Sequence, residues 1–262
     1  MTRPNTEWDA ASYHQVSAPQ TSWGHRVLSR LALDGGERAI DAGCGSGRLT
    51  AALVERLPRG HVVALDRSWN MLQVARTNLR PAFCRRVSFV HAELPALPIA
   101  GWADVVFSTA TFHWIADHPA LFAAVFAALR PGGRLHAQCG GGPNLHAAHA
   151  LAEGVMARPL YAGHFSDWPG AWTFATADDT ATRLAAAGFV DVDANLEAAP
   201  TTLATEADYR AFVTTVIYHP HLDRLPGVLR APFIDEVTAL AAQETPPFTL
   251  DYWRLNMSAR RP

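Results

Sequence analysis

Short apolar runs alternate with amphipathic stretches along the first half of the chain. The runs lie at residues 38–42, 61–66, 87–93, 103–109 and 134–140. Uninterrupted apolar runs of this length are typical of parallel strands that are buried on both faces. The stretches between them place apolar residues at helical spacing. Strands that alternate with helices in this way predict βαβ units around a parallel sheet.

Proline and glycine mark the expected ends of the helices in this half. Helices are predicted at residues 20–33, 49–57, 69–79 and 118–130. Pro81 is expected to stop the third of these, because proline has no backbone N–H to donate within a helix. The segment "RPGG" at 130–133 predicts a helix stop and a turn before the strand at 134–140.

The regular alternation of predicted strands and helices ends after Gly140. The expected elements are then a mixture of loop and helix (141–180), a capped helix ending at Gly188 (176–189), a strand (190–198), a mostly helical stretch (203–245) and a closing strand (248–261). Helical insertions therefore interrupt the α/β pattern twice near its end.

Composition limits the kind of protein. At 262 residues and 28.4 kDa, the chain suits one large α/β domain. Hydrophobic residues make up 49% and charged residues 18%, which is ordinary for a globular protein. The net charge is -2 and no basic run is present, so no nucleic-acid partner is expected.

The location of the protein is predicted from what its sequence lacks. Residues 1–15 have no apolar core of the kind found in signal peptides, and no stretch approaches the roughly 20 apolar residues needed to span a bilayer. Cys44, Cys84 and Cys139 have no CxxC spacing, which suits free thiols. We expect a cytoplasmic protein with no membrane partner.

A glycine-rich loop is the first candidate for chemistry. The segment "AIDAGCGSGRLT" at 39–50 carries Gly43, Gly45 and Gly47 between a predicted strand and a predicted helix. Such a turn brings the backbone close to a nucleotide or another nucleoside, although it also occurs as a tight turn without ligand.

Two acidic residues narrow the choice of cofactor. Asp66 ends the next strand, about 20 residues after the loop, where a carboxylate can accept both ribose hydroxyls. Asp41 precedes the first glycine and would repel a pyrophosphate at the helix N-terminus. A cationic nucleoside without phosphate, such as S-adenosylmethionine, fits better than a nicotinamide dinucleotide.

At this point the sequence resembles the class I S-adenosylmethionine-dependent methyltransferases. The similarity covers "AIDAGCGSG", "VVALDRSWNML", "FVHAELPALP", "ADVVFSTATFHWIADH" and "LRPGGRLHA", from about Ala39 to Ala137. It implies an α/β fold with a seven-stranded, mostly parallel, doubly wound sheet of Rossmann-like type whose last strand is antiparallel. The implied cofactor is S-adenosylmethionine, with S-adenosylhomocysteine as product.

The resemblance also assigns a cofactor site. Tyr13 and Gln20 are expected over the methionine end, Glu93 with the Leu94 backbone at the adenine, and Met71 against the adenosine or in the core. The complete expected set is Tyr13, Gln20, Asp41, Gly43, Cys44, Gly45, Gly47, Asp66, Arg67, Met71, Glu93, Leu94, Thr109 and Ala110.

A closer similarity is to the trans-aconitate methyltransferase type, carried by the N-terminal segment, "FHWIADH" and the late insertion. It implies one domain over residues 1–262, with an N-terminal helical cap (1–36), a cofactor-binding core (37–140) and insertions that form a substrate lid (141–180 and 200–246). A small-molecule acceptor is expected, with a monomer or homodimer as the assembly.

His113 and Tyr13 are the predicted catalytic residues. His113 follows the fourth strand and could act as a general base, or shape the pocket floor without reacting. Transfer to a carboxylate needs no base, because the nucleophile is already ionised. The predicted substrate contacts are His113, Trp114, Trp168 and Tyr218.

The sequence is compatible with two kinds of acceptor pocket. A tricarboxylate acceptor would need arginines converging from the insertions, with Arg158, Arg183, Arg210, Arg224 and Arg230 as candidates. The aromatics of "WPGAW" and "TVIYHPH" favour an apolar acceptor instead. The insertion histidines, among them His219 and His221, have poor metal-ligand spacing, so no metal is expected.

We therefore predict methyl transfer to a small molecule, with O-methylation of a carboxylate or hydroxyl ahead of C- or N-methylation. A protein that binds the cofactor without transferring the methyl group is the alternative from another class.

Overall fold

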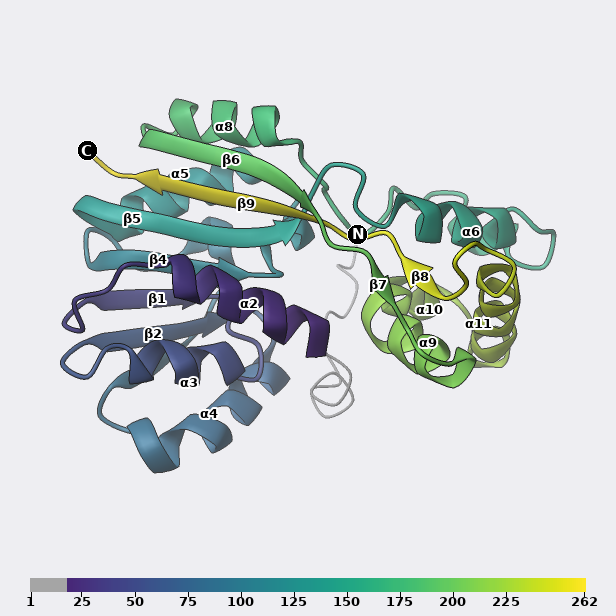
Figure 1. Cartoon of the computed structure of the whole chain (residues 1–262), viewed down its shortest axis with the longest axis horizontal. Helices are drawn as coiled ribbons and strands as arrows, with labels where there is room; N and C mark the ends of the chain where they lie inside the picture. The colour runs from purple at the N-terminus through teal and green to yellow at the C-terminus, as the bar shows by residue number, and fades with distance from the viewer. Residues whose placement is uncertain (1–17) are drawn as a thin grey trace.

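The computed structural model describes residues 18–262, and their arrangement is shown in Figure 1. Seven strands form one sheet in the order β3-β2-β1-β4-β5-β9-β6. These strands are β1 (Arg38–Ala42), β2 (His61–Asp66), β3 (Val87–His91), β4 (Ala103–Thr109), β5 (Leu129–Gly140), β6 (Val190–Ala198) and β9 (Trp253–Arg260). β9 runs antiparallel to both of its neighbours, while the pairs from β3 to β5 are parallel. The predicted fold, including the antiparallel last strand, is confirmed.

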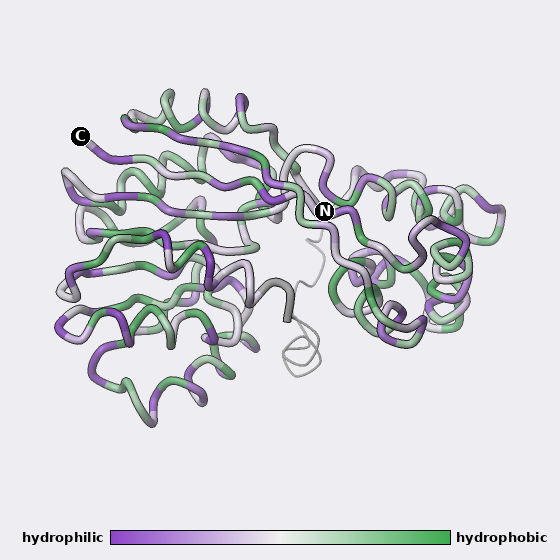
Figure 2. The backbone as a smooth tube through the Cα atoms, viewed as in Figure 1, coloured by the Kyte–Doolittle hydropathy of each residue, from purple (hydrophilic) through white to green (hydrophobic). Residues whose placement is uncertain are grey.

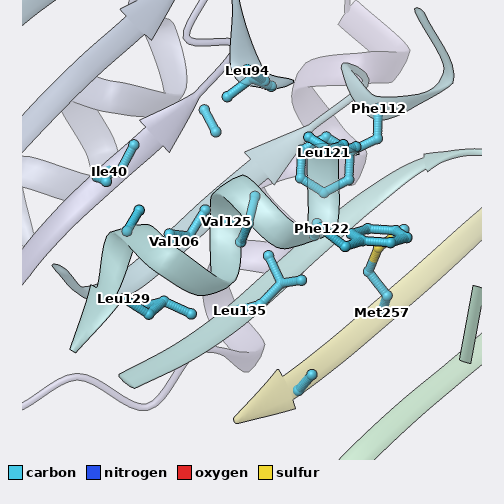
Figure 3. Close-up of a cluster of buried hydrophobic side chains, with 14 of the residues drawn as sticks. Ile40, Leu94, Val106, Phe112, Leu121, Phe122, Val125, Leu129, Leu135 and Met257 are labelled. Atoms are coloured by element: carbon cyan, nitrogen blue, oxygen red, sulfur yellow. The ribbon is translucent and has the colours of Figure 1, made fainter. Parts of the chain in front are cut away.

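Helices cover both faces of the sheet. The helices α2 (Ala18–Arg30), α3 (Arg48–Glu55) and α4 (Trp69–Phe83) bury one face, and α5 (His118–Ala128) and α8 (Ala177–Ala186) bury the other. Figure 3 shows Leu121 and Val125 of α5 close to Val106 and Leu135 of the sheet. Because both faces are covered, the inner residues of the central strands are buried and mainly apolar, as at Val62–Leu65 of β2, and Figure 2 shows hydrophobic stretches in the sheet between polar ones.

Several predicted boundaries are wrong. The closing strand predicted at 248–261 is divided into β8 (Thr249–Leu250), which pairs with β7 (Thr201–Thr202), and β9. α4 continues through Pro81 to Phe83, since a proline this close to the helix end costs only one late hydrogen bond. β5 begins at Leu129, within the helix predicted at 118–130, because Leu129 pairs with Ala103 before the register shifts to Val105 and Arg134. By contrast, Thr176 caps α8 through the Asp179 N–H, and Gly188 follows with φ +98°, as predicted.

The two insertions gather into one helical lobe. It contains α6 (His146–Met156), α7 (Ala162–Phe165), α9 (Glu206–Phe212), a π-helical turn (Val213–Ile217), α10 (His219–Arg224), α11 (Gly227–Ala241) and the strand pair β7 (Thr201–Thr202) and β8 (Thr249–Leu250). The lobe has its own apolar core, which Trp23 of α2 also joins. In Figure 1 it lies beyond the ends of β4 and β5 at which these parallel strands finish. Ligands of open α/β sheets bind at this edge.

No helix within residues 18–262 combines the length and the apolar character needed to cross a membrane.

Candidate cofactor and acceptor site

The glycine loop folds back tightly over the end of β2. The N–H groups of Gly43 and Cys44 both donate to the Leu65 carbonyl oxygen, at 2.8 and 2.9 Å. Gly43 has φ +83°, and a Cβ added there would lie 2.1 Å from Thr111 Oγ1. Gly45 has φ +53° and no atom within 4 Å of an added Cβ. Gly43 therefore allows Thr111 to approach the backbone of the loop closely, and Gly45 leaves open space on the side of the loop that faces the cleft.

Asp66 connects this loop to the start of α4. Its Oδ2 accepts from the Gly45 N–H at 2.9 Å, and its Oδ1 accepts from the Ser68 N–H at 2.8 Å. Burial raises the pKa of Asp66 above its ordinary value, although both of these N–H donors act to lower it. Each carboxylate oxygen keeps acceptor capacity, so a ribose hydroxyl can still donate to it.

Asp41 is buried behind the loop and does not line the cleft in which Asp66 lies. Its Oδ2 accepts from Thr50 Oγ1 at 2.6 Å. Burial raises the pKa of Asp41 to about 7, and the nearby Asp66 adds to this rise. The predicted direct contact of this side chain with the cofactor is therefore corrected. Asp41 fixes the start of α3, and its negative charge is partial at neutral pH.

We expect Asp41→Asn to remove a pH-dependent loss of stability. A carboxyl with a raised folded-state pKa contributes stability below its unfolded pKa, and this contribution is lost as the pH rises through about 7. The gain in unfolding free energy on going from wild type to Asp41→Asn should grow by about 2–3 kcal/mol from pH 5 to pH 8. Urea unfolding of the cofactor-free proteins measures it. A gain that stays constant with pH would contradict the assignment.

A cleft with about 1100 Å³ of open space lies at the carboxyl ends of the parallel strands. Of the predicted cofactor residues, those in its wall are Gly43, Gly45, Asp66, Arg67, Met71, Leu94, Thr109 and Ala110. They come from the ends of β2 and β4, from the first turn of α4, and from the segments that follow β1, β2, β3 and β4. The open space at Gly45 and the carboxylate of Asp66 in this wall are compatible with a nucleoside such as that of S-adenosylmethionine.

Three other predicted cofactor residues do not line the cleft. Gly47 is needed for helix packing, because an added Cβ would meet Leu79 Cδ1 at 2.8 Å. Cys44 is buried below the loop, and Glu93 precedes the short 3₁₀ helix Leu94–Ala96 without lining the cleft. Tyr13 lies outside the described residues, as does the side chain of Gln20 at the start of α2.

His113 lines the other half of the cleft as a neutral side chain. It lies in the 3₁₀ helix Phe112–Trp114, and its Nδ1 accepts from the Gly140 N–H at 3.2 Å. Burial lowers the pKa of His113 to about 3, and the charge of Arg254 contributes to this. With Nδ1 acting as acceptor, the proton of the neutral ring is on Nε2. His113 is therefore suited to donate a hydrogen bond and poorly suited to act as a general base.

Arg254 is the residue that the sequence reasoning missed. It lies on β9 opposite Gly140, is 3% exposed, and lines the cleft. Its guanidinium lies over the Trp23 ring, 4.6 Å from the centroid. Its burial shields it from water, so its interaction with a bound anion would be strong. The signal available in the sequence was a charged residue, Arg254, next to apolar Leu255 within the predicted closing strand.

The arginines predicted to converge from the insertions do not line the cleft. Three form ion pairs within the lobe or its loops: Arg158 with Glu236, Arg210 with Asp235, and Arg224 with Asp167. The remaining two bond to His118 Nδ1 (Arg183) and to the Leu225 carbonyl (Arg230). This prediction is corrected.

The predicted substrate contacts are divided between three places. Trp114 lines the cleft with His113, and its ring centroid lies 5.5 Å from that of Trp172. Trp168 lines a second cleft next to the first. Tyr218 is fully buried and donates from its hydroxyl to the Ala148 carbonyl oxygen at 2.8 Å. Its predicted substrate contact is therefore corrected.

Within residues 18–262, no three histidine, cysteine, aspartate or glutamate side chains are grouped so that they could hold a metal ion.

The strand order is that of the methyltransferase fold, with the glycine loop and Asp66 at the carboxyl ends of its strands, and comparison with known proteins agrees on the family. The family described as "Methyltransferase domain" matches residues 39–133. A trans-aconitate 2-methyltransferase from Methylobacterium nodulans (strain LMG 21967 / CNCM I-2342 / ORS 2060) is 30% identical over 272 residues, covering 97% of this chain and 98% of that protein. Another, from Azoarcus sp. (strain BH72), is 37% identical over 131 residues, which is half of each chain.

Solved structures share the fold at low sequence identity. Phosphoethanolamine N-methyltransferase 2 of Haemonchus contortus, in complex with S-adenosylhomocysteine, has a TM-score of 0.63 and 17% identity, covering 97% of this chain and 57% of that one. The [4+2]-cyclase SpnF has a TM-score of 0.60 and 20% identity, covering 100% and 85%. The chain belongs to the class I S-adenosylmethionine-dependent methyltransferases, and along its whole length it is similar to trans-aconitate 2-methyltransferases.

Proposed function

We propose that the protein transfers a methyl group from S-adenosylmethionine to a carboxylate oxygen of a small organic acid. The observation that carries this proposal is the buried guanidinium of Arg254 in the wall of the cleft, beside the neutral ring of His113. The full-length relatives named trans-aconitate 2-methyltransferase support the same kind of acceptor.

The cofactor half is assigned to residues from the first strands. Asp66 would accept from the ribose hydroxyls, Met71 and Leu94 would pack against the adenosine, and Gly45 would leave room for it. The backbone at Thr109 and Ala110 would face the methionine portion. When bound, the cofactor supplies a methyl group on a positively charged sulfur.

The acceptor half needs to position an anion and exclude water. Arg254 offers a bidentate guanidinium to the acceptor carboxylate, and His113 offers its Nε2–H. Trp172 and Phe174 stack at 6.2 Å with their planes 8° apart and close one side of this half. A carboxylate is already ionised, so alignment replaces proton transfer as the task of the protein. We propose that residues 141–180 and 200–246 form this acceptor lid.

Product analysis tests the proposal. The protein, incubated with methyl-labelled cofactor and a panel of carboxylic acids and alcohols that includes trans-aconitate, should place the label in a base-labile ester. Matched alcohols should remain unlabelled. Label in an ether or amine would overturn carboxyl transfer. Binding of S-adenosylhomocysteine with no labelled product from any acceptor would favour the protein that binds the cofactor without transferring methyl.

A further inference from the structure

A second cleft lies next to the acceptor half of the first. It lies between α6, the loop at 166–176 and α10, and the space between its walls, open solvent included, is about 870 Å³. Asn144, Trp172 and Phe174 line both clefts, so these three side chains form the boundary between them. A ligand held at Arg254 and His113 that extends past this boundary would enter the second cleft.

Two imidazoles in the wall of this cleft have nitrogen atoms without partners. Among the described residues, neither His149 Nε2 nor His221 Nδ1 has a hydrogen-bond partner, although both atoms are buried. The rings stack with their centroids 6.3 Å apart and their planes at 19°, and His221 is 3% exposed. Buried polar atoms are normally satisfied, and each unsatisfied atom costs on the order of 1–3 kcal/mol. Because neither atom is exposed to the cleft as the rings stand, a polar ligand group would reach them only if the rings turn, and the two atoms would then offer it hydrogen bonds.

Among the described residues, the rest of the wall carries no arginine and combines three aromatic side chains with a third imidazole, Met156, and glycine and proline residues; the aromatic side chains are Trp168, Trp172 and Phe174, and the imidazole is His146. The ring of Trp168 lies 4.5 Å from that of His221, and the ring of Trp172 lies 4.8 Å from that of His149. Glu153 is the carboxylate in this wall, and burial lowers the pKa of His149 to about 4 and of His221 to about 3. An anionic group near His149 and His221 would therefore meet two neutral rings and the negative charge of Glu153, without an arginine. A planar or apolar body with an uncharged hydroxyl or carbonyl would be accommodated.

We propose that the second cleft holds the far end of the methyl acceptor, and that this end is an unsaturated or aromatic body with a neutral hydrogen-bonding group. The inference rests on the proposed function, because it takes the carboxylate of the same molecule to lie at Arg254. It makes the preferred acceptor a monocarboxylic acid with an extended planar body. The additional carboxylates of a tricarboxylate would find no arginine among the described residues of the second cleft.

Calorimetry with S-adenosylhomocysteine present tests this without requiring methyl transfer. The ligands are phenylacetate, 3-phenylpropenoate and 5-phenylpentadienoate, each with and without a 4-hydroxyl group, so that three lengths are compared. In wild type, the hydroxyl should improve affinity about tenfold at one length. In His221→Phe or His149→Phe, which keep a ring but lose its nitrogens, the gain should fall below about twofold.

His61→Phe is the matched control, because His61 begins β2 at the opposite edge of the sheet, and it should keep the tenfold gain. Two histidine variants guard against one that fails to fold. No gain at any length, or a gain that both variants retain, would overturn the inference. If the hydroxyl improves binding but no acid yields an ester, the proposed function fails while the second cleft stands as a binding site.

Discussion

Asp66→Ala is expected to weaken binding of S-adenosylhomocysteine by at least about 100-fold. The carboxylate accepts from the Gly45 and Ser68 N–H groups, so it both shapes the glycine loop and offers acceptors to the ribose. Hydrogen bonds to a charged group contribute roughly 1.5–3 kcal/mol each, and two of them account for a loss of this size. Isothermal titration calorimetry measures the affinity directly.

Three further variants sharpen this test. Asp66→Asn keeps the shape and one acceptor oxygen, so it should lie between wild type and Asp66→Ala. Gly45→Val places a branched side chain in the open space at φ +53° and should also prevent binding. Asp193→Ala removes an exposed carboxylate of β6 and should bind normally. Wild-type affinity in a folded Asp66→Ala protein would refute this assignment of the ribose site.

The cofactor half could be predicted because its parts are local in sequence. Gly43, Gly45 and Asp66 each follow a short apolar strand, and parallel strands end at one edge of the sheet. Their juxtaposition therefore follows from two βα units. The Asp41 side chain was misplaced although strand periodicity offered a signal. Residues of β1 alternate between faces, so Asp41 shares the face of Ala39, which packs with the helices that include α3.

The acceptor half could not be predicted, because it is assembled from distant segments. Arg254 meets His113 and Gly140 only because β9 inserts between β5 and β6. No local pattern indicates that insertion. Trp172 and Phe174 lie in a loop whose course depends on how α6 and α10 pack in the lobe. The orientation of the arginines in the lobe could not be predicted either, because it depends on ion pairs with carboxylates from other segments.

Arg254→Met is expected to lower kcat/KM for carboxylic acids by about 10³-fold while leaving the affinity for S-adenosylhomocysteine within a few-fold of wild type. Truncating one member of a buried, hydrogen-bonded charge pair costs roughly 2–5 kcal/mol, and methionine preserves much of the arginine stem. Arg254→Lys keeps the charge but loses the planar fork, so a smaller loss of about 10- to 100-fold is expected. Transfer kinetics and calorimetry on the same preparations measure both quantities.

The separation between the two measurements decides the role of Arg254. Its distance from the glycine loop along the sheet order, with β4 and β5 between β1 and β9, predicts that acceptor binding alone should suffer. If Arg254→Met also weakened S-adenosylhomocysteine binding, Arg254 would be assigned to cofactor binding instead of acceptor binding. Unchanged transfer kinetics in Arg254→Met would mean that Arg254 only packs against Trp23 and does not bind the acceptor. Arg30→Met, which removes an exposed arginine that pairs with Glu197, the residue opposite Arg254 on β6, controls for general loss of charge and should leave both values unchanged.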